Sequence, residues 1–147
     1  MYHALPMPDE YTAIRQLAER YVDAVNRRNQ DAWLATWAPD GVFDYGHDDP
    51  PRSHNALARF WDMSVEGMEV LMSVTSGVVE RVEGDTAKAR WYHTEYVQRG
   101  DDTPLAGLTL YEDDVVRIDG EWRFALREHY VLFSGELEGS FYPYDPR

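Results

Sequence analysis

The chain has 147 residues, a length that suits one domain, and 44% of them are hydrophobic, which is enough for a proper core. Its formal net charge of -13 argues against a nucleic-acid partner, because Lys and Arg must neutralise the phosphates. Disulfides, thiolate zinc sites and cysteine nucleophiles are excluded because the chain contains no cysteine. We expect a cytoplasmic protein with no membrane partner, since no run is long and apolar enough to span a bilayer and no secretory signal is visible.

The first helix is expected after a loose lead-in at residues 1–8. Apolar residues recur at helical spacing from Ile14 to Val25, and either Asp9 or Thr12 is in place to cap the helix. Asn26 continues the inner-face spacing, which is unusual for an amide near a helix end. It either bonds nearby carbonyls or serves a pocket.

A short second helix is expected to place Trp33 and Trp37 one turn apart on one face. The sequence Pro39-Asp40-Gly41 then ends that helix, and residues 42–45 have the character of a short strand. After a loop, Ser53 is in place to cap a third helix.

From residue 69 the pattern changes to the alternation of strands. The four strands expected are residues 69–82, 86–98, 104–118 and 121–133, with an aromatic tail at 134–147. Asp119-Gly120 between the last two is a strong hairpin signal. Helices followed by an antiparallel sheet are an α+β order, in which the sheet must curl to bury one face under the helices. We therefore expect a half-open cone.

The central strand carries an unusual set of side chains. Because side chains alternate along a strand, Ala87, Ala89, Trp91, His93 and Glu95 share one face. An imidazole and a carboxylate on an otherwise buried face either are satisfied in a core or line a cavity. We expect His93 to transfer protons near neutrality, with Glu95 orienting it or acting as base itself. The alternative is a core histidine bonded to a neighbouring strand.

Polar residues also follow the last two strands. Asp113 is expected to have a structural role, bonding backbone or an arginine. Arg127 and His129 lie on the face opposite the apolar Trp122. They point to solvent or a partner subunit, unless the strand twists or bulges near Leu126 and turns them inward.

The segment with His47, Asp48, Asp49 and His54 contains metal-ligand residue types, but it is loop-like and its spacing matches no compact metal site. No glycine-rich phosphate loop or nucleotide fingerprint is present. We expect chemistry without a metal or cofactor, or no chemistry.

Short motifs in a fixed order, from about Ile14 to Arg127, carry a resemblance. They are Arg20-Tyr21 to Asn26, Asp31, Trp37-Ala38-Pro39-Asp40 into Phe43-Asp44-Tyr45, Gly84-Asp85-Thr86-Ala87, Tyr111-Glu112-Asp113 and Arg117-Ile118-Asp119-Gly120-Glu121-Trp122-Arg123-Phe124. In this order the chain resembles the SnoaL-like, nuclear transport factor 2-like superfamily, which includes polyketide cyclases, scytalone dehydratase, ketosteroid isomerase and a hexachlorocyclohexane dehydrochlorinase. The resemblance implies a cone-shaped, curved antiparallel or mixed sheet closed by three N-terminal helices, a cystatin-like α+β barrel.

The resemblance also implies where a proton would be removed. In the dehydratase and dehydrochlorinase branches, an aspartate near the end of the first helix pairs with a histidine on the first long strand. The matching positions here hold Asn26 and, at or next to the second, Met72, neither of which takes a proton at neutral pH. Tyr45 matches a pocket tyrosine of the dehydratase branch. The missing pair shifts the expectation from dehydration towards cyclisation.

We therefore expect a cofactor-independent cyclase, isomerase or dehydratase that acts on a hydrophobic, oxygenated small molecule such as a polyketide intermediate. His93 would transfer the proton, while Tyr45 and Asn26 would polarise a carbonyl. The side chains expected to line the substrate pocket are Trp91, Glu95, Met72, Trp61 and Tyr111. A homodimer is expected. The alternative is a non-catalytic binding or assembly module of the same fold.

Overall fold

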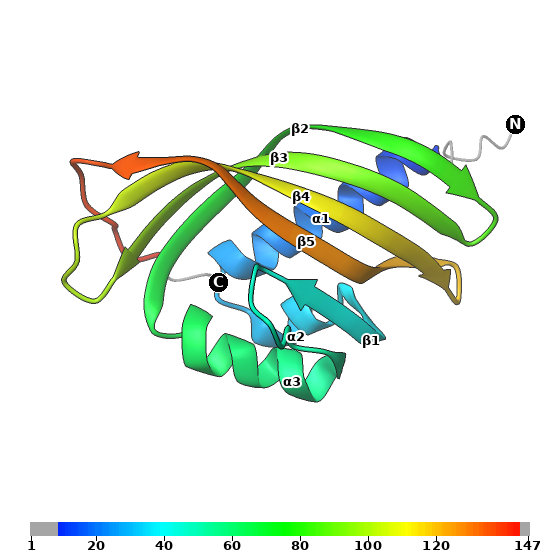
Figure 1. Cartoon of the computed structure of the whole chain (residues 1–147), viewed down its shortest axis with the longest axis horizontal. Helices are drawn as coiled ribbons and strands as arrows, with labels where there is room; N and C mark the ends of the chain where they lie inside the picture. The colour runs from blue at the N-terminus through cyan, green and yellow to red at the C-terminus, as the bar shows by residue number, and fades with distance from the viewer. Residues whose placement is uncertain (1–8, 145–147) are drawn as a thin grey trace, which may run out of the picture.

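The structure is a computed structural model that describes residues 9–144 (Figure 1). Its elements in chain order are α1 (Glu10–Asn26), α2 (Gln30–Leu34), β1 (Trp37–Asp44), α3 (Ser53–Phe60), a π-helical turn (Trp61–Val65), β2 (Met68–Glu83), β3 (Thr86–Arg99), β4 (Leu105–Ile118) and β5 (Glu121–Glu136). The lead-in expected at residues 1–8 lies outside the described residues. Within residues 9–144, none of the helices has the length and apolar character needed to cross a membrane.

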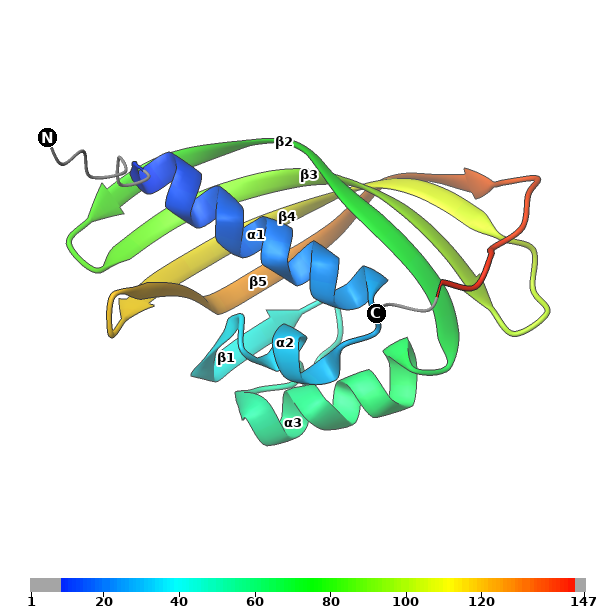
Figure 2. The same ribbon diagram turned by 180° about the vertical axis from the view of Figure 1, so that it is seen from behind.

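The five strands form one mixed sheet in the order β1-β5-β4-β3-β2. Strands β2 to β5 are antiparallel neighbours, and β1 runs parallel to β5. Figure 1 shows the four long strands curving together, and Figure 2, from behind, shows α1 lying across their concave face with α2 and α3 beyond it. The α+β class and the curved sheet covered by N-terminal helices are therefore confirmed, with the sheet left open rather than closed into a barrel.

Helix α1 forms as its pattern predicts. Of the two candidate caps, Asp9 takes the role: its Oδ1 accepts a hydrogen bond from the backbone N–H of Thr12 at 2.7 Å. The apolar face of the helix is buried against the sheet, and its members are Ile14, Leu17, Ala18, Tyr21, Ala24 and Val25. Burial of this stripe is what holds the helix on the sheet.

The second helix is shorter than predicted, because α2 ends at Leu34 and Trp37 begins β1. The helical prediction for Trp37 is wrong because pairing with β5 overrides the local spacing: the Thr36 carbonyl accepts a hydrogen bond from the Phe124 N–H at 2.8 Å, and Trp37 lies opposite Phe124. The two tryptophans are nevertheless in contact, with the ring centroids of Trp33 and Trp37 5.7 Å apart. The cap expected at Ser53 is also wrong, since Ser53 is the first residue of α3 and makes no capping hydrogen bond.

The four long strands match their predicted ranges closely, although β5 runs on to Glu136 and so takes the first residues of the expected tail. Asp119 and Gly120 have positive φ angles of 52° and 81°, as a type I′ hairpin turn requires. Gly77 on β2 has a different role. It lies opposite Trp91, and a Cβ at that position would come within 2.0 Å of the indole ring. The glycine therefore makes room for the buried tryptophan.

Candidate functional site

A bulge in β5 decides which face its polar residues occupy. Phe124 lies opposite Val115, whereas Leu126 lies opposite Asp114, so Ala125 is an extra residue in β5. The extra residue shifts the alternation by one position. Beyond it, Arg127 is fully buried on the inner face, the side of the sheet that packs against α1. Of the two arrangements that the sequence left open, the bulged one is present.

The bulge completes a polar group on the inner face, which we call the Glu95 cluster: His93 and Glu95 of β3, Thr109 and Tyr111 of β4, and His129 of β5. The hydroxyls of Thr109 and Tyr111 both donate to Glu95 Oε1, at 2.9 Å and 2.8 Å. His129 Nε2 lies 3.7 Å from the same oxygen. The His93 ring packs on the Tyr111 ring with 4.4 Å between centroids. Three adjacent strands thus bring their polar side chains to one point.

The carboxylate of Glu95 is ionised at neutral pH. Burial raises its pKa, but the neighbouring His129 imidazole and the hydroxyls of Tyr111 and Thr109 together outweigh burial, and the net shift is downward. The side chains of Glu95 and His129 are 14% and 19% exposed. The pair is therefore partly exposed to solvent, whereas His93, Thr109, Asp113 and Arg127 on the same face are buried.

His93 is neutral in the fold. Its side chain is completely buried, and neither ring nitrogen has a hydrogen-bond partner. Burial, with the positive charge of Arg127, lowers the pKa of His93 to about 3, so the titration near neutrality that an unperturbed imidazole would show does not apply. A neutral imidazole still carries one N–H donor and one acceptor. Leaving such groups unpaired costs about 1–3 kcal/mol each, so an orphaned imidazole marks a place for a polar atom of a ligand or water.

Behind the cluster lies a buried ion pair. Arg127 Nε and Nη2 donate to the two oxygens of Asp113 at 2.8 Å and 3.2 Å, and both side chains are fully buried. The guanidinium also lies over the rings of Tyr21, Tyr111 and Phe124, at 4.4, 4.1 and 4.1 Å. The structural role expected for Asp113 is confirmed. The pair holds β4 to β5 where the bulge interrupts the regular ladder.

Asn26 and Met72 meet, but through the backbone of β2. The Asn26 amide donates to the Met72 carbonyl at 2.8 Å, and its oxygen accepts from the Met72 N–H at 2.9 Å. The amide therefore ties the end of α1 to β2, which favours the backbone-bonding alternative over a carbonyl-polarising role. Met72 lies directly opposite Glu95 in the β2–β3 ladder, so it adjoins the cluster.

Two of the remaining predicted residues lie apart from the Glu95 cluster. Trp61 is buried among the helices, where its Nε1 donates to Glu66 at 3.1 Å. Trp91 lies under α1, with its ring 5.9 Å from that of Tyr11. Both side chains are part of the buried packing rather than the polar cluster.

Tyr45 lies closer to the cluster but does not touch it. Its ring packs 5.3 Å from Phe43 and 5.0 Å from Phe60. The Phe43 ring in turn lies 6.2 Å from His129, so one phenylalanine separates the tyrosine from the cluster. The structure therefore brings together His93, Glu95 and Tyr111, with Met72 beside them.

Sequence reasoning missed Thr109 and left His129 undecided. Thr109 alternates with Tyr111 and Asp113 along β4, so strand periodicity contained the signal for it. His129 depended on the bulge, for which no local pattern exists. Within residues 9–144, no group of three or more His, Cys, Asp or Glu side chains is placed to hold a metal ion.

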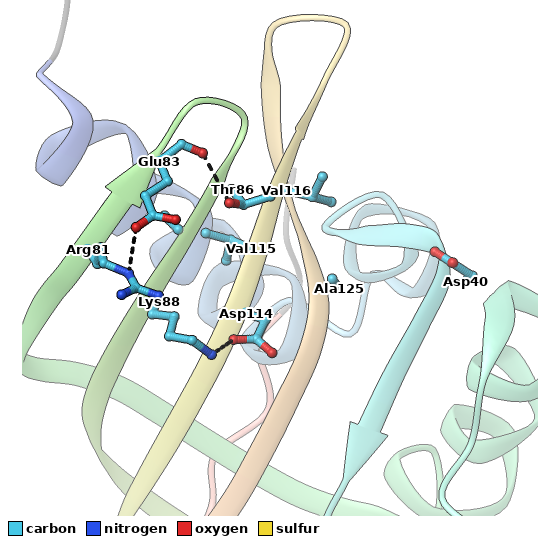
Figure 3. A pocket seen from close by; sticks show the side chains of 10 residues that line it. Asp40, Arg81, Glu83, Thr86, Lys88, Asp114, Val115, Val116 and Ala125 are labelled. Atoms are coloured by element: carbon cyan, nitrogen blue, oxygen red, sulfur yellow. Dashed lines mark hydrogen bonds and ion pairs between the residues drawn. The ribbon is translucent and has the colours of Figure 1, made fainter.

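Two surface hollows lie away from the Glu95 cluster. One, of about 460 Å³, lies between the β2–β3 hairpin and β1 (Figure 3). Four of its charged side chains are paired with one another: Lys88 with Asp114 at 2.6 Å, and Arg81 with Glu83 at 3.1 Å. The other, of about 440 Å³, is formed by residues 103–104 and 136–139. Neither hollow is lined by a histidine.

Solved structures of several proteins share this fold. The chain is similar to a Novosphingobium aromaticivorans protein named as an aromatic ring hydroxylase (24% identity, TM-score 0.80, 90% of this chain and 96% of that one). It is also similar to the hexachlorocyclohexane dehydrochlorinase LinA-type3 of Novosphingobium barchaimii (16%, 0.79, 90% and 94%). A third is a protein named as a scytalone dehydratase from N. aromaticivorans (16%, 0.79, 89% of each chain). At these identities the likeness shows the fold alone.

No curated protein sequence matches the chain. The family model described as the SnoaL-like domain matches residues 8–128, most of the chain. The match spans all the described helices and strands β1 to β4, and it ends in β5 one residue before His129. The protein therefore belongs to the SnoaL-like family.

Proposed function

We propose that the protein is a cofactor-independent enzyme that moves a proton on a small, hydrophobic, oxygenated molecule, in a cyclisation, isomerisation or elimination. One observation carries the proposal: the inner face buries an anchored carboxylate and an unpartnered imidazole among aromatic rings. Buried polar groups of this kind lower the stability of a fold, and core packing alone does not call for them. Perturbed groups of this type cluster at functional sites.

His93 has a changed role in this proposal. As a neutral imidazole it donates its free N–H to a substrate oxygen and stabilises the negative charge that develops there when an adjacent C–H bond loses its proton. Tyr111 and Met72 line the same place, and Tyr45 lies behind Phe43 on the approach. The net charge of -13 favours a neutral substrate over an anionic one. A polyketide intermediate with a carbonyl group fits this chemistry.

The names of two solved relatives support the reaction class. One is a dehydrochlorinase and the other is named as a scytalone dehydratase, and both names denote eliminations. The second candidate function is a non-catalytic binding module. One observation favours it. Both hollows described above lie away from the Glu95 cluster, whereas an enzyme binds its substrate beside the groups that transfer the proton.

A homodimer is also part of the proposal. Strand β1 pairs with β5 only as far as Glu128, and the next residues of β5, from Tyr130 to Phe133, are exposed and apolar. An unpaired edge of this kind invites another chain. Light scattering should give twice the chain mass, and Phe133→Glu should return a monomer. A monomeric wild type would remove the dimer from the proposal.

The enzyme and the module are separated by incubating the protein with extracted metabolites and recording native mass spectra. An enzyme binds a hydrophobic, oxygenated compound and releases it changed, and His93→Ala lowers the turnover at least about tenfold while the far-UV spectrum is kept. The exposed Glu112, on the other face of the sheet, offers a matched control in Glu112→Gln. A compound that is bound and released unchanged identifies a binding module. Unchanged turnover in His93→Ala removes the imidazole from the mechanism.

A further inference from the structure

The inner face lacks the proton-removing pair that the family resemblance would place on α1 and β2, since those positions hold Asn26 and Met72. Other titratable groups on this face are unsuited to replace it. Asp113 is bound by Arg127 through both oxygens, and burial lowers the pKa of His93 to about 3, which makes its imidazole a weak base. A base for a substrate must be reachable as well as ionisable.

Glu95 and His129 meet both conditions. Their side chains are 14% and 19% exposed, and His129 Nε2 lies 3.7 Å from Glu95 Oε1. The carboxylate is held in place by the hydroxyls of Thr109 and Tyr111. The imidazole packs against the Tyr111 ring at 4.9 Å. A fixed carboxylate beside an imidazole is the arrangement that orients a histidine for general-base catalysis, and such contacts are often long before a substrate binds.

We propose that Glu95 and His129 form the acid–base pair of this protein, with His129 as the base and Glu95 as its positioning residue. The inference rests on the proposed function and names the group that takes the proton. The carboxylate and imidazole of the missing family pair are thus supplied by β3 and β5 instead of α1 and β2. The bulge at Ala125 makes this possible, because it turns His129 inward.

The step balances without a cofactor. With Nε2–H directed at Glu95, the free Nδ1 of His129 accepts a proton from a carbon next to the substrate carbonyl. The C–H bond breaks, its electron pair becomes the C=C bond of an enolate, and the enolate oxygen receives a hydrogen bond from His93. Return of the proton to another carbon completes an isomerisation, and its transfer to a departing hydroxyl completes a loss of water. The substrate class is a neutral carbonyl compound with an apolar body, because the chain is acidic and the rings of Phe43 and Tyr111 adjoin the pair.

The pair lies among other charged and titratable groups. On β3 it faces His93, on β4 Tyr111 and Asp113, on β5 Arg127, and on α1 Tyr21. Of these, Tyr21 and Tyr111 remain protonated at neutral pH, because burial raises both of their pKa values.

The test uses 5-nitrobenzisoxazole, a flat, neutral probe that needs only a base. The base takes the proton from the ring carbon, the N–O bond breaks, and the products are a nitrile and a coloured phenolate. We expect the wild type to open the ring faster than equal concentrations of free imidazole and acetate. His129→Gln should lower the second-order rate constant at least about tenfold, with Glu112→Gln as the unaffected carboxylate control.

Two further measurements separate a catalytic pair from a structural one. Added imidazole should restore activity to His129→Ala, which a merely structural loss would not allow. Glu95→Gln should also lower the rate constant, because the imidazolium that forms in the reaction loses its neighbouring carboxylate. Circular dichroism checks that each variant is folded. His129→Asn replaces a His129 variant that is not folded.

The outcomes also separate this inference from the proposed function. A wild type no faster than the free bases overturns the pair, whatever the metabolite experiment shows. A fast wild type whose rate is unchanged in His129→Gln and Glu95→Gln places the base elsewhere and leaves the enzyme proposal standing. Unchanged metabolites together with a slow wild type overturn both.

Discussion

Acid should destabilise this protein through His93, and substitution of His93 should remove that part of the pH dependence. Burial, reinforced by Arg127, lowers the pKa of the folded imidazole to about 3 from an ordinary value of 6.5. Between these two pH values the imidazole is protonated in the unfolded chain and neutral in the folded protein. The stability contributed by the neutral imidazole is therefore complete above pH 6.5 and is lost as the pH falls towards 3.

The size of this loss follows from the pKa shift. Each pH unit between the two values changes the free energy of unfolding by about 1.4 kcal/mol for one proton, so acidification from pH 6.5 to pH 4 removes about 3 kcal/mol. A typical domain is stable by only about 5–15 kcal/mol, so the loss is large enough to measure. Carboxylates also titrate on acidification, but they are common to the wild type and a His93 variant. The difference between the two proteins isolates the imidazole.

The assay is urea unfolding of the wild type and His93→Gln at pH 7, 6, 5 and 4, followed by tryptophan fluorescence. We expect the variant to gain about 3 kcal/mol relative to the wild type between pH 7 and pH 4. His47→Gln, a change at an exposed histidine, should show the pH dependence of the wild type. A difference between wild type and His93→Gln that stays constant over this range, or that changes with the opposite sign, would refute a buried, neutral His93.

Two more substitutions test the contacts that hold the site in place, each by urea unfolding at pH 7. Asn26→Ala removes both hydrogen bonds to Met72 and should cost about 1–3 kcal/mol, whereas Asn55→Ala at an exposed position of α3 should cost less than about 0.5 kcal/mol; equal losses would contradict the tie between α1 and β2. Arg127→Met leaves Asp113 buried without its partner and should cost about 3–5 kcal/mol, and adding Asp113→Asn should recover part of that loss. A double variant no more stable than the single one would argue against a coupled pair.

Repeating patterns predicted the parts of the fold that depend on neighbours along the chain. The helical spacing from Ile14 to Val25 and the alternation from β2 to β5 are local, because one apolar stripe or face has to be buried. The same alternation placed Trp91, His93 and Glu95 on one inner face. Helical spacing gave a wrong prediction at Trp37, where pairing with β5 forms a strand instead.

The chemistry depended on contacts between distant segments. The sequence by itself determined that an imidazole and a carboxylate share the inner face of β3, since two residues on one strand need only the period of two. Tertiary structure alone decided that His129 joins them, because the extra residue Ala125 is accommodated where β4 and β5 pair. It also decided that Asn26 bonds the backbone of Met72. A bulge and a long-range hydrogen bond are chosen by the free energy of the whole packed sheet, and no short stretch of residues encodes that sum.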